Sequence, residues 1–268
     1  MISFTSVPDF EKFVEIFTGL YRATFGYSFG FGLCTLPVSI FLVHIPNSQN
    51  WVLVDAADPG SPQKLLSAIS AHFASFPNHN LKYVVITHCH FDHTGAIPRL
   101  LEEYKDLKVI LGQPELPFIA DGVQYSELSG DTYIYQAYKH FANPTKVIVS
   151  RDKILALEEG KENEFEFFET LEPICTFGHT PGSMSYLHRP SNSILIGDCM
   201  MNLPSFPSFS PSIQLAPPIT THNMKKAKES IKKIAELEGV NYVFLSHDQS
   251  EKGLDVESVR SFAKSLKP

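Results

Sequence analysis

The chain has 268 residues, of which 43% are hydrophobic and 19% charged, and its formal net charge is −7 at pH 7. This composition is typical of a folded globular protein and excludes a disordered chain. The acidic balance argues against nucleic acid as a main partner, because phosphate binding needs a basic surface.

The cysteines and the apolar segments indicate the compartment. The four cysteines form no CxxC pair and lack the spacing of a secreted disulfide framework. The first residues carry no basic segment followed by an apolar run, and the apolar-rich region 25–45 is interrupted by Gly, Ser, Pro and Thr. We therefore expect a cytoplasmic protein that makes no contact with a membrane.

The N-terminal half is predicted to alternate strands and helices. Helical periodicity after a Pro-Asp start signal predicts a helix over residues 10–20. Residues 36–45 and 51–55 are predicted to form two strands of a hairpin. The pattern then predicts a helix over 62–73, a buried strand over 83–87, a helix over 95–104 and a strand over 108–111.

Residues 112–143 have a weaker pattern and many aromatic side chains. Compact domains rarely keep so long a loop without a reason, and lids over active sites are one such reason. We interpret the segment as a lid or insertion, with simple packing of its aromatic residues on the main body as the alternative.

The C-terminal half continues the mixture of strands and helices. The pattern predicts strands over 146–149, 174–177, 185–187 and 193–196, an irregular segment over 202–218, a helix over 223–237, a strand over 242–245 and a helix over 256–266. The order of the elements suggests sheets covered by helices, in a single domain over residues 1–268.

The sequence THCHFDHTG, residues 87–95, concentrates ligand-type side chains. His88 and His90 are two residues apart, so in an extended segment they project to the same side and can hold one ion. Asp92 and His93 follow where a helix is expected to begin, and they can serve a second ion. Neutral imidazole is the commonest metal ligand, so the run predicts metal binding.

Three further ligand-type residues follow predicted strands. His179 lies in FGHTPGS, Asp198 ends ILIGD, and His247 ends FLSH. A catalytic metal ion usually has three protein ligands and one open position, so strand ends are where the missing ligands are expected. Three strand ends that each present one such residue strengthen the prediction of a metal site.

The set THCHFDH, GHTPGS, IGD and LSH, in this order over about residues 36–247, resembles the metallo-β-lactamase superfamily. The resemblance implies an α+β fold of four layers, an αββα sandwich of two mixed β-sheets flanked by helices, with the metal site at one edge of the sheets. It also implies that Asp55, at the end of VLVD, supports the site without binding metal.

By motif, the resemblance implies two divalent metal ions and a complete set of ligands. The first ion would be held by His88, His90 and His179, the second by Asp92, His93 and His247, and Asp198 would bridge them. Zinc is the usual ion, with iron or manganese as alternatives, because mixed nitrogen and oxygen ligands select weakly.

Two adjacent cations predict a hydrolase, in which a metal-bridging hydroxide attacks a small ester, lactone or related carbonyl substrate. Asp92 and Asp198 are the expected catalytic residues, with Asp92 orienting the nucleophile or carrying its proton. Lactonases of the superfamily have a tyrosine three positions after the bridging aspartate. This chain has Met201 there, so a tyrosine from residues 112–143 is a candidate replacement.

Other readings remain open. One alternative is an oxidoreductase like the persulfide dioxygenases, which use one iron; another is a metal-binding member without activity, against which the complete ligand set argues. The expected partner is a small-molecule substrate, in an apolar pocket walled by Phe206, Phe209 and the tyrosines of residues 112–143. The aromatic segment 25–31 predicts either a homodimer surface or ordinary core.

Overall fold

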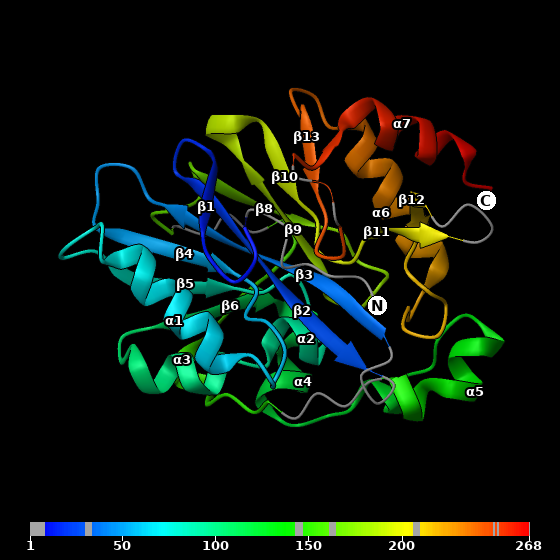
Figure 1. Cartoon of the computed structure of the whole chain (residues 1–268). Helices are drawn as coiled ribbons and strands as arrows, with labels where there is room; N and C mark the ends of the chain where they lie inside the picture. Colours follow the sequence, from blue (N-terminus) through cyan, green and yellow to red (C-terminus); the bar gives the residue numbers. More distant parts are fainter. Residues whose placement is uncertain are drawn as a thin grey trace.

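The computed structural model describes residues 9–29, 34–142, 147–160, 165–205, 210–248, 250 and 252–267. Two β-sheets face each other, and helices cover the outer face of each sheet (Figure 1). The four layers form the predicted αββα sandwich, and both sheets mix parallel and antiparallel strand pairs. No helix in the described part of the chain is both long enough and apolar enough to cross a lipid bilayer.

The first sheet has seven strands that follow one another in chain order. They are β1 (Val14–Phe17), β2 (Leu20–Phe29), β3 (Cys34–His44), β4 (Asn50–Val54), β5 (Asn80–Val85), β6 (Lys108–Gly112) and β7 (Ile154–Leu157). The strands β1 to β4 are antiparallel, whereas β4 to β7 are parallel. The carboxyl ends of β4, β5 and β6 therefore lie side by side at one edge of the sheet.

Helices connect the parallel strands of this sheet. α1 (Pro62–Phe73) joins β4 to β5, and α2 (Phe91–Thr94) and α3 (Ile97–Glu103) join β5 to β6. The segment interpreted as a lid or insertion folds into short helices between β6 and β7. These are η1 (Gln113–Glu115), α4 (Leu116–Ala120), η2 (Tyr125–Glu127) and α5 (Tyr133–Ala142), and η3 (Arg151–Lys153) precedes β7.

The second sheet has five strands. In spatial order they are β14 (Leu254–Asp255), β13 (Tyr242–Phe244), β10 (Ser193–Leu195), β9 (Met184–His188) and β8 (Leu171–Cys175). The short η4 (Arg189–Ser191) joins β9 to β10, and α6 (Met224–Glu236) and α7 (Val256–Ser265) cover the outer face. A separate hairpin consists of β11 (Met200–Ser205) and β12 (Ser210–Leu215).

Three buried apolar clusters hold the four layers together. Alternate residues of a strand point to opposite faces, so Ile40 and Leu42 of β3 pack toward α1 and α3, while Phe41 and Val43 pack toward the second sheet. The third cluster joins the second sheet to α6 and α7 through Ile194, Ile196, Ile231, Ile234 and Val259. Each layer is thus fixed by burial of apolar side chains, the main favourable term in folding.

The prediction of a helix over residues 10–20 was wrong. Val14–Phe17 forms β1, which pairs with β2 through a tight turn in which Gly19 has φ +76°. A short apolar run cannot be assigned to helix or strand by periodicity alone. The turn at Gly19 and the β-branched residues of this run favour the strand that is observed.

Two further predictions in the C-terminal half were wrong. The segment 202–218, expected to be irregular, contains most of the β11–β12 hairpin, in which Pro204 lies opposite Pro211. A two-stranded sheet has two free edges, which tolerate proline. Residues 147–149 do not form a strand, and β7 begins at Ile154 instead. Lys146 lies outside the described residues. So do residues 30 and 31 of the aromatic segment 25–31 considered for a homodimer, and Phe25 of that segment is buried in the core.

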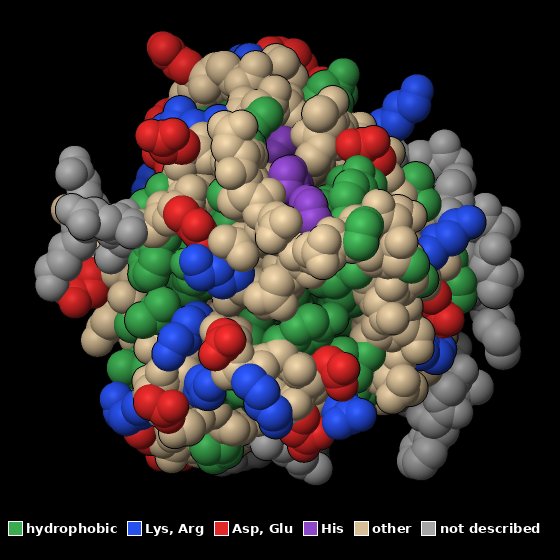
Figure 2. Space-filling view, turned by 90° about the vertical axis from the view of Figure 1, so that its left-hand side faces the viewer, with side chains coloured by type: hydrophobic (Ala, Val, Ile, Leu, Met, Phe, Trp, Pro, Cys, Tyr) green, Lys and Arg blue, Asp and Glu red, His purple; other side chains and the backbone are tan. Residues whose placement is uncertain are grey.

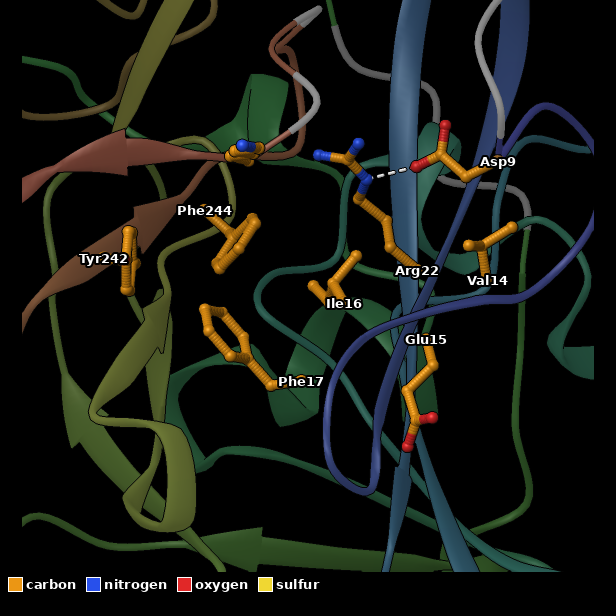
Figure 3. Close-up of a pocket in the computed structure, with 9 residues that line it drawn as sticks. Asp9, Val14, Glu15, Ile16, Phe17, Arg22, Tyr242 and Phe244 are labelled. Carbon is orange, nitrogen blue, oxygen red and sulfur yellow. Dashed lines mark hydrogen bonds and ion pairs between the residues drawn. The ribbon is translucent and has the colours of Figure 1, made fainter.

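Two hollows lie away from the predicted ligands. A cavity of about 350 Å³ between β1 and β13 is lined by Phe17, Tyr242 and Phe244, with the Arg22–Asp9 ion pair beside it (Figure 3). A groove of about 460 Å³ is lined by His44 and His188 among others. Figure 2 shows histidine side chains in a hollow on the left-hand face of Figure 1. None of the predicted metal ligands lines either hollow.

Candidate metal centre

The structure brings together all the residues that were predicted to bind metal. The loop after β5 and the short helix α2 carry His88, His90, Asp92 and His93, while His179, Asp198 and His247 follow β8, β10 and β13 of the second sheet. Their ligand atoms form two buried groups, and within each group all atoms lie within 4.8 Å of one another. The groups are His88, His90, His179 and Asp198, and Asp92, His93 and His247.

The carboxylate of Asp198 lies between the two groups. Its Oδ2 is 3.6 Å from Nε2 of His179 and 3.1 Å from Nε2 of His247. Its Oδ1 is 3.4 Å from Nε2 of His93. One carboxylate therefore contacts histidines of both groups, which is the position expected of a bridging ligand.

Hydrogen bonds orient the histidines of the second group. His247 Nδ1 lies 2.7 Å from the carbonyl oxygen of Pro37, and His93 Nδ1 lies 2.8 Å from Oδ2 of Asp55. Both partners can only accept a hydrogen bond, so each Nδ1 donates. A neutral imidazole in this tautomer turns the lone pair of Nε2 toward the centre, as metal ligation requires.

Threonine hydroxyls hold two of the three histidines of the first group. His88 Nδ1 lies 3.0 Å from Oγ1 of Thr87, and His179 Nδ1 lies 3.2 Å from Oγ1 of Thr221. His90 instead presents Nδ1, which is 3.0 Å from Nε2 of His179. The first group therefore also directs Nδ1 of His90 and Nε2 of His179 toward a common position.

Buried atoms without hydrogen-bond partners show that the site fits metal ions. Nε2 of His88, Nε2 of His93 and Oδ1 of Asp198 are buried and have no hydrogen-bond partner in the described part of the chain. Buried polar atoms nearly always have a partner, because leaving one without costs roughly 1–3 kcal/mol. Divalent cations would satisfy all three, and imidazole nitrogens with carboxylate oxygens form a ligand set that suits zinc.

The electrostatics of the two groups differ. Burial lowers the pKa of His90 to about 3 and that of His179 to about 4, so these imidazoles are neutral, the form that binds metal. Burial also acts on His247, but the carboxylates of Asp198 and Asp92 outweigh it and raise its pKa to about 10. The pKa of Asp198 lies well below its usual range, because nearby His247 and His93 outweigh its burial. The carboxylates of Asp92 and Asp198 thus favour positive charge at the second group, which a bound cation would supply.

The backbone adopts positive φ at two residues beside these ligands. Asp55 has φ +65°, and Gly197, next to Asp198, has φ +54°. A Cβ atom at Gly197 would lie 2.7 Å from Oγ1 of Thr87, the residue that bonds His88 and Asp55. Positive φ in residues other than glycine is uncommon and clusters at functional sites.

We predict that Asp55→Asn weakens metal binding by the second group about 10- to 100-fold. Asp55 accepts hydrogen bonds from Thr87 N and from His93 Nδ1, one at each oxygen. The amide nitrogen of asparagine would face one of these donors in either orientation. Asparagine tolerates positive φ, so the backbone is preserved. Competition titration of the metal-stripped protein with zinc measures the effect.

Asp58→Asn is the matched control for this variant. Asp58 is buried in the same loop, but its carboxylate accepts hydrogen bonds from Gly60 N and Ser61 Oγ in the turn before α1. The Asp58→Asn variant should bind zinc with the same affinities as the unmodified protein. Unchanged affinities in Asp55→Asn would contradict the supporting role given to Asp55.

The residues considered for the substrate pocket are placed as follows. Tyr125 donates its hydroxyl to Glu115, and Tyr135 donates to the carbonyl oxygen of Tyr125, so neither hydroxyl faces the centre. The side chain of Tyr133 is 96% exposed. Met201 is buried in the β11–β12 hairpin. Phe206 and Phe209 lie outside the described residues.

Sequence reasoning missed two side chains that support the centre. Thr221 bonds His179 from the loop before α6. Glu115 follows β6, the strand next to β5, and is fully buried. The signal that could have revealed Glu115 is its place after the third of the four parallel strands, since Asp55 and His88 follow the first two.

Known proteins resemble this chain in sequence and in fold. A sequence profile of the metallo-beta-lactamase superfamily matches residues 35–247. "Probable metallo-hydrolase YflN" of Bacillus subtilis is 27% identical over 216 residues, covering 77% of this chain and 79% of that protein. "Probable metallo-hydrolase MJ0888" of Methanocaldococcus jannaschii is 30% identical over 149 residues, covering 55% of this chain and 61% of that protein.

A solved structure shares the fold at low sequence identity. The crystal structure of a metallo-beta-lactamase from Erythrobacter litoralis matches with a TM-score of 0.65 and 15% identity, covering 99% of both chains. At this identity the similarity concerns the fold alone. It agrees with the sandwich of two mixed sheets described above.

Proposed function

The chain belongs to the metallo-beta-lactamase superfamily, and from this premise we propose that it is a metal-dependent hydrolase of a small ester, lactone or related carbonyl substrate. The observation that carries the proposal is the pair of buried ligand groups joined by Asp198. A carboxylate shared between two ligand groups suits two neighbouring ions, most simply two zinc ions. When bound, such ions polarise a carbonyl oxygen and supply a water nucleophile at neutral pH.

Asp92 is the residue of the centre that we assign to proton transfer. Its side chain is 11% exposed, whereas those of Asp198 and His247 are 4% and 2% exposed. Asp92 is therefore the most exposed of these three side chains. Its Oδ2 lies 3.4 Å from Nε2 of His247, which orients the carboxylate toward the reacting groups. From there it can accept the proton of the nucleophile and pass it to the leaving group.

The remaining side chains prepare the site without taking part in the reaction. Asp55, Thr87 and Thr221 hold the ring nitrogens that face away from the centre. The ring of Tyr125 packs edge-on against His90 with centroids 5.1 Å apart. These contacts keep the ligands in place before substrate arrives, the kind of preorganisation on which catalysis depends.

The proposal is tested by measuring the metal content of the purified protein and assaying a panel of small lactones and esters. We expect about two zinc or similar ions per chain and hydrolysis of at least one class of substrate. Across partly stripped samples, the rate of hydrolysis should follow the metal content. One iron ion per chain, with oxygen uptake on thiol persulfides and no hydrolysis, would overturn the proposal in favour of the oxidative alternative.

A further inference from the structure

Glu115 connects three segments around the centre, although it belongs to neither ligand group. It lies at the end of η1 and is fully buried. Its Oε2 accepts hydrogen bonds from Cys89 N, at 3.0 Å, and from the hydroxyl of Tyr125. Its Oε1 accepts from Thr180 Oγ1 at 2.8 Å and from Gly182 N at 2.7 Å. A buried carboxylate with four donors is held firmly in place, since charge-assisted hydrogen bonds are the strong ones.

The donors are next to the ligands of the first group. Cys89 stands between His88 and His90, and Thr180 follows His179 directly. The two loops that carry these histidines belong to different sheets, after β5 and after β8. The carboxylate of Glu115 thus joins the two loops across the junction of the sheets.

The backbones also meet closely at this point. A Cβ atom at Gly182 would lie 2.8 Å from the backbone nitrogen of Glu115, and one at Gly112 would lie 2.3 Å from the carbonyl oxygen of Gly182. Both contacts are too short for any side chain larger than hydrogen. The loop after β8 therefore rests directly on the segment that carries Glu115, which favours a fixed distance between them.

We propose that Glu115 is a positioning residue. It sets the metal affinity of the group formed by His88, His90 and His179, because it fixes the position of their two loops relative to each other. The inference rests on the proposed dinuclear hydrolase and deepens it. It assigns the first residues after β6, which form η1, a role in metal binding. Hydrogen-bond partners one step beyond the ligands commonly change metal affinity 10- to 100-fold when they are removed.

Glu115→Gln is a sharp test because it keeps the shape of the side chain. Each oxygen of Glu115 faces one backbone N–H, that of Cys89 or that of Gly182. The amide nitrogen of glutamine would oppose one of these N–H groups in either orientation. Glu127→Gln is the matched control, since Glu127 is exposed on the same segment and its side chain accepts a hydrogen bond from Gln124 N, away from the centre.

The experiment is a zinc titration of the metal-stripped full chain against a chromophoric chelator, which resolves two binding steps. In Glu115→Gln we expect one step to weaken about 10- to 100-fold and the other to change less than about threefold. The visible spectrum of bound cobalt should change for the weakened step only. Glu127→Gln should match the unmodified protein. A purely structural role would weaken both steps together.

Two milder variants keep the test decisive if Glu115→Gln does not fold. Tyr125→Phe and Thr180→Val each remove a hydroxyl that donates to Glu115, and the hydroxyl of Thr180 also lies 2.7 Å from Oγ of Ser183. Each should weaken the same step by about three- to tenfold. Unchanged steps, or equal weakening of both steps in the folded variants, would overturn the proposal. The titration needs no turnover, so a chain that binds two ions but hydrolyses nothing would contradict the hydrolase and leave the role of Glu115 standing.

Discussion

Replacing Asp198 with asparagine is expected to lower kcat/KM on the order of 10³-fold or more. The carboxylate of Asp198 contacts histidines of both ligand groups, with Oδ1 on His93 and Oδ2 on His179 and His247. Asparagine keeps the shape but removes the negative charge and turns one oxygen into a donor, which cannot bind a cation. Both ions should therefore bind more weakly, and the rate should fall even at saturating substrate.

Steady-state kinetics and metal analysis of the same preparation measure this effect. Asp58→Asn again serves as the control, because it alters a buried aspartate whose carboxylate bonds the turn before α1. Its kcat/KM should stay close to that of the unmodified protein. An Asp198→Asn variant that retains two ions and full activity would refute the bridging role.

Removing the metal ions is expected to lower the midpoint of thermal unfolding by about 10 °C. Without metal, Nε2 of His88 and of His93 and Oδ1 of Asp198 are buried without hydrogen-bond partners among the described residues. A ligand present at 1,000 times its Kd stabilises the folded chain by about 4 kcal/mol. For a chain of this size, each kcal/mol corresponds to about 2–4 °C.

Differential scanning calorimetry with and without a chelator measures the shift. Adding zinc back should restore the midpoint, whereas magnesium should not, because it prefers oxygen ligands. Elemental analysis must show that the chelated sample has lost its metal. A midpoint that stays constant in such a sample would show that the ligand groups do not couple metal binding to folding.

Local spacing explains why most of the ligands could be predicted. His88, His90, Asp92 and His93 fall within six residues, and His179, Asp198 and His247 each follow an apolar run typical of a buried strand. The observed strands β5, β8, β10 and β13 do end just before these residues. The motif order also indicated the superfamily, and with it the four-layer fold.

The remaining features depend on contacts that a sequence does not display. Whether Val14–Phe17 forms a helix or a strand is decided by its pairing with β2. Glu115 is a single acidic residue in a segment without clear periodicity. Its role depends on Cys89, Thr180 and Gly182, which come close only when the two sheets pack together.

The division of the ligands between the two sheets has a consequence for how the chain folds. The first sheet supplies His88, His90, Asp92 and His93, but His179, Asp198 and His247 arrive with the second. Neither half alone can build a complete centre, so tight metal binding and docking of the sheets are thermodynamically linked. During synthesis, residue 247 must leave the ribosome before the last ligand joins the centre. Metal uptake would then mark the end of folding. A chain truncated before residue 247 would lack a ligand and would bind metal less tightly.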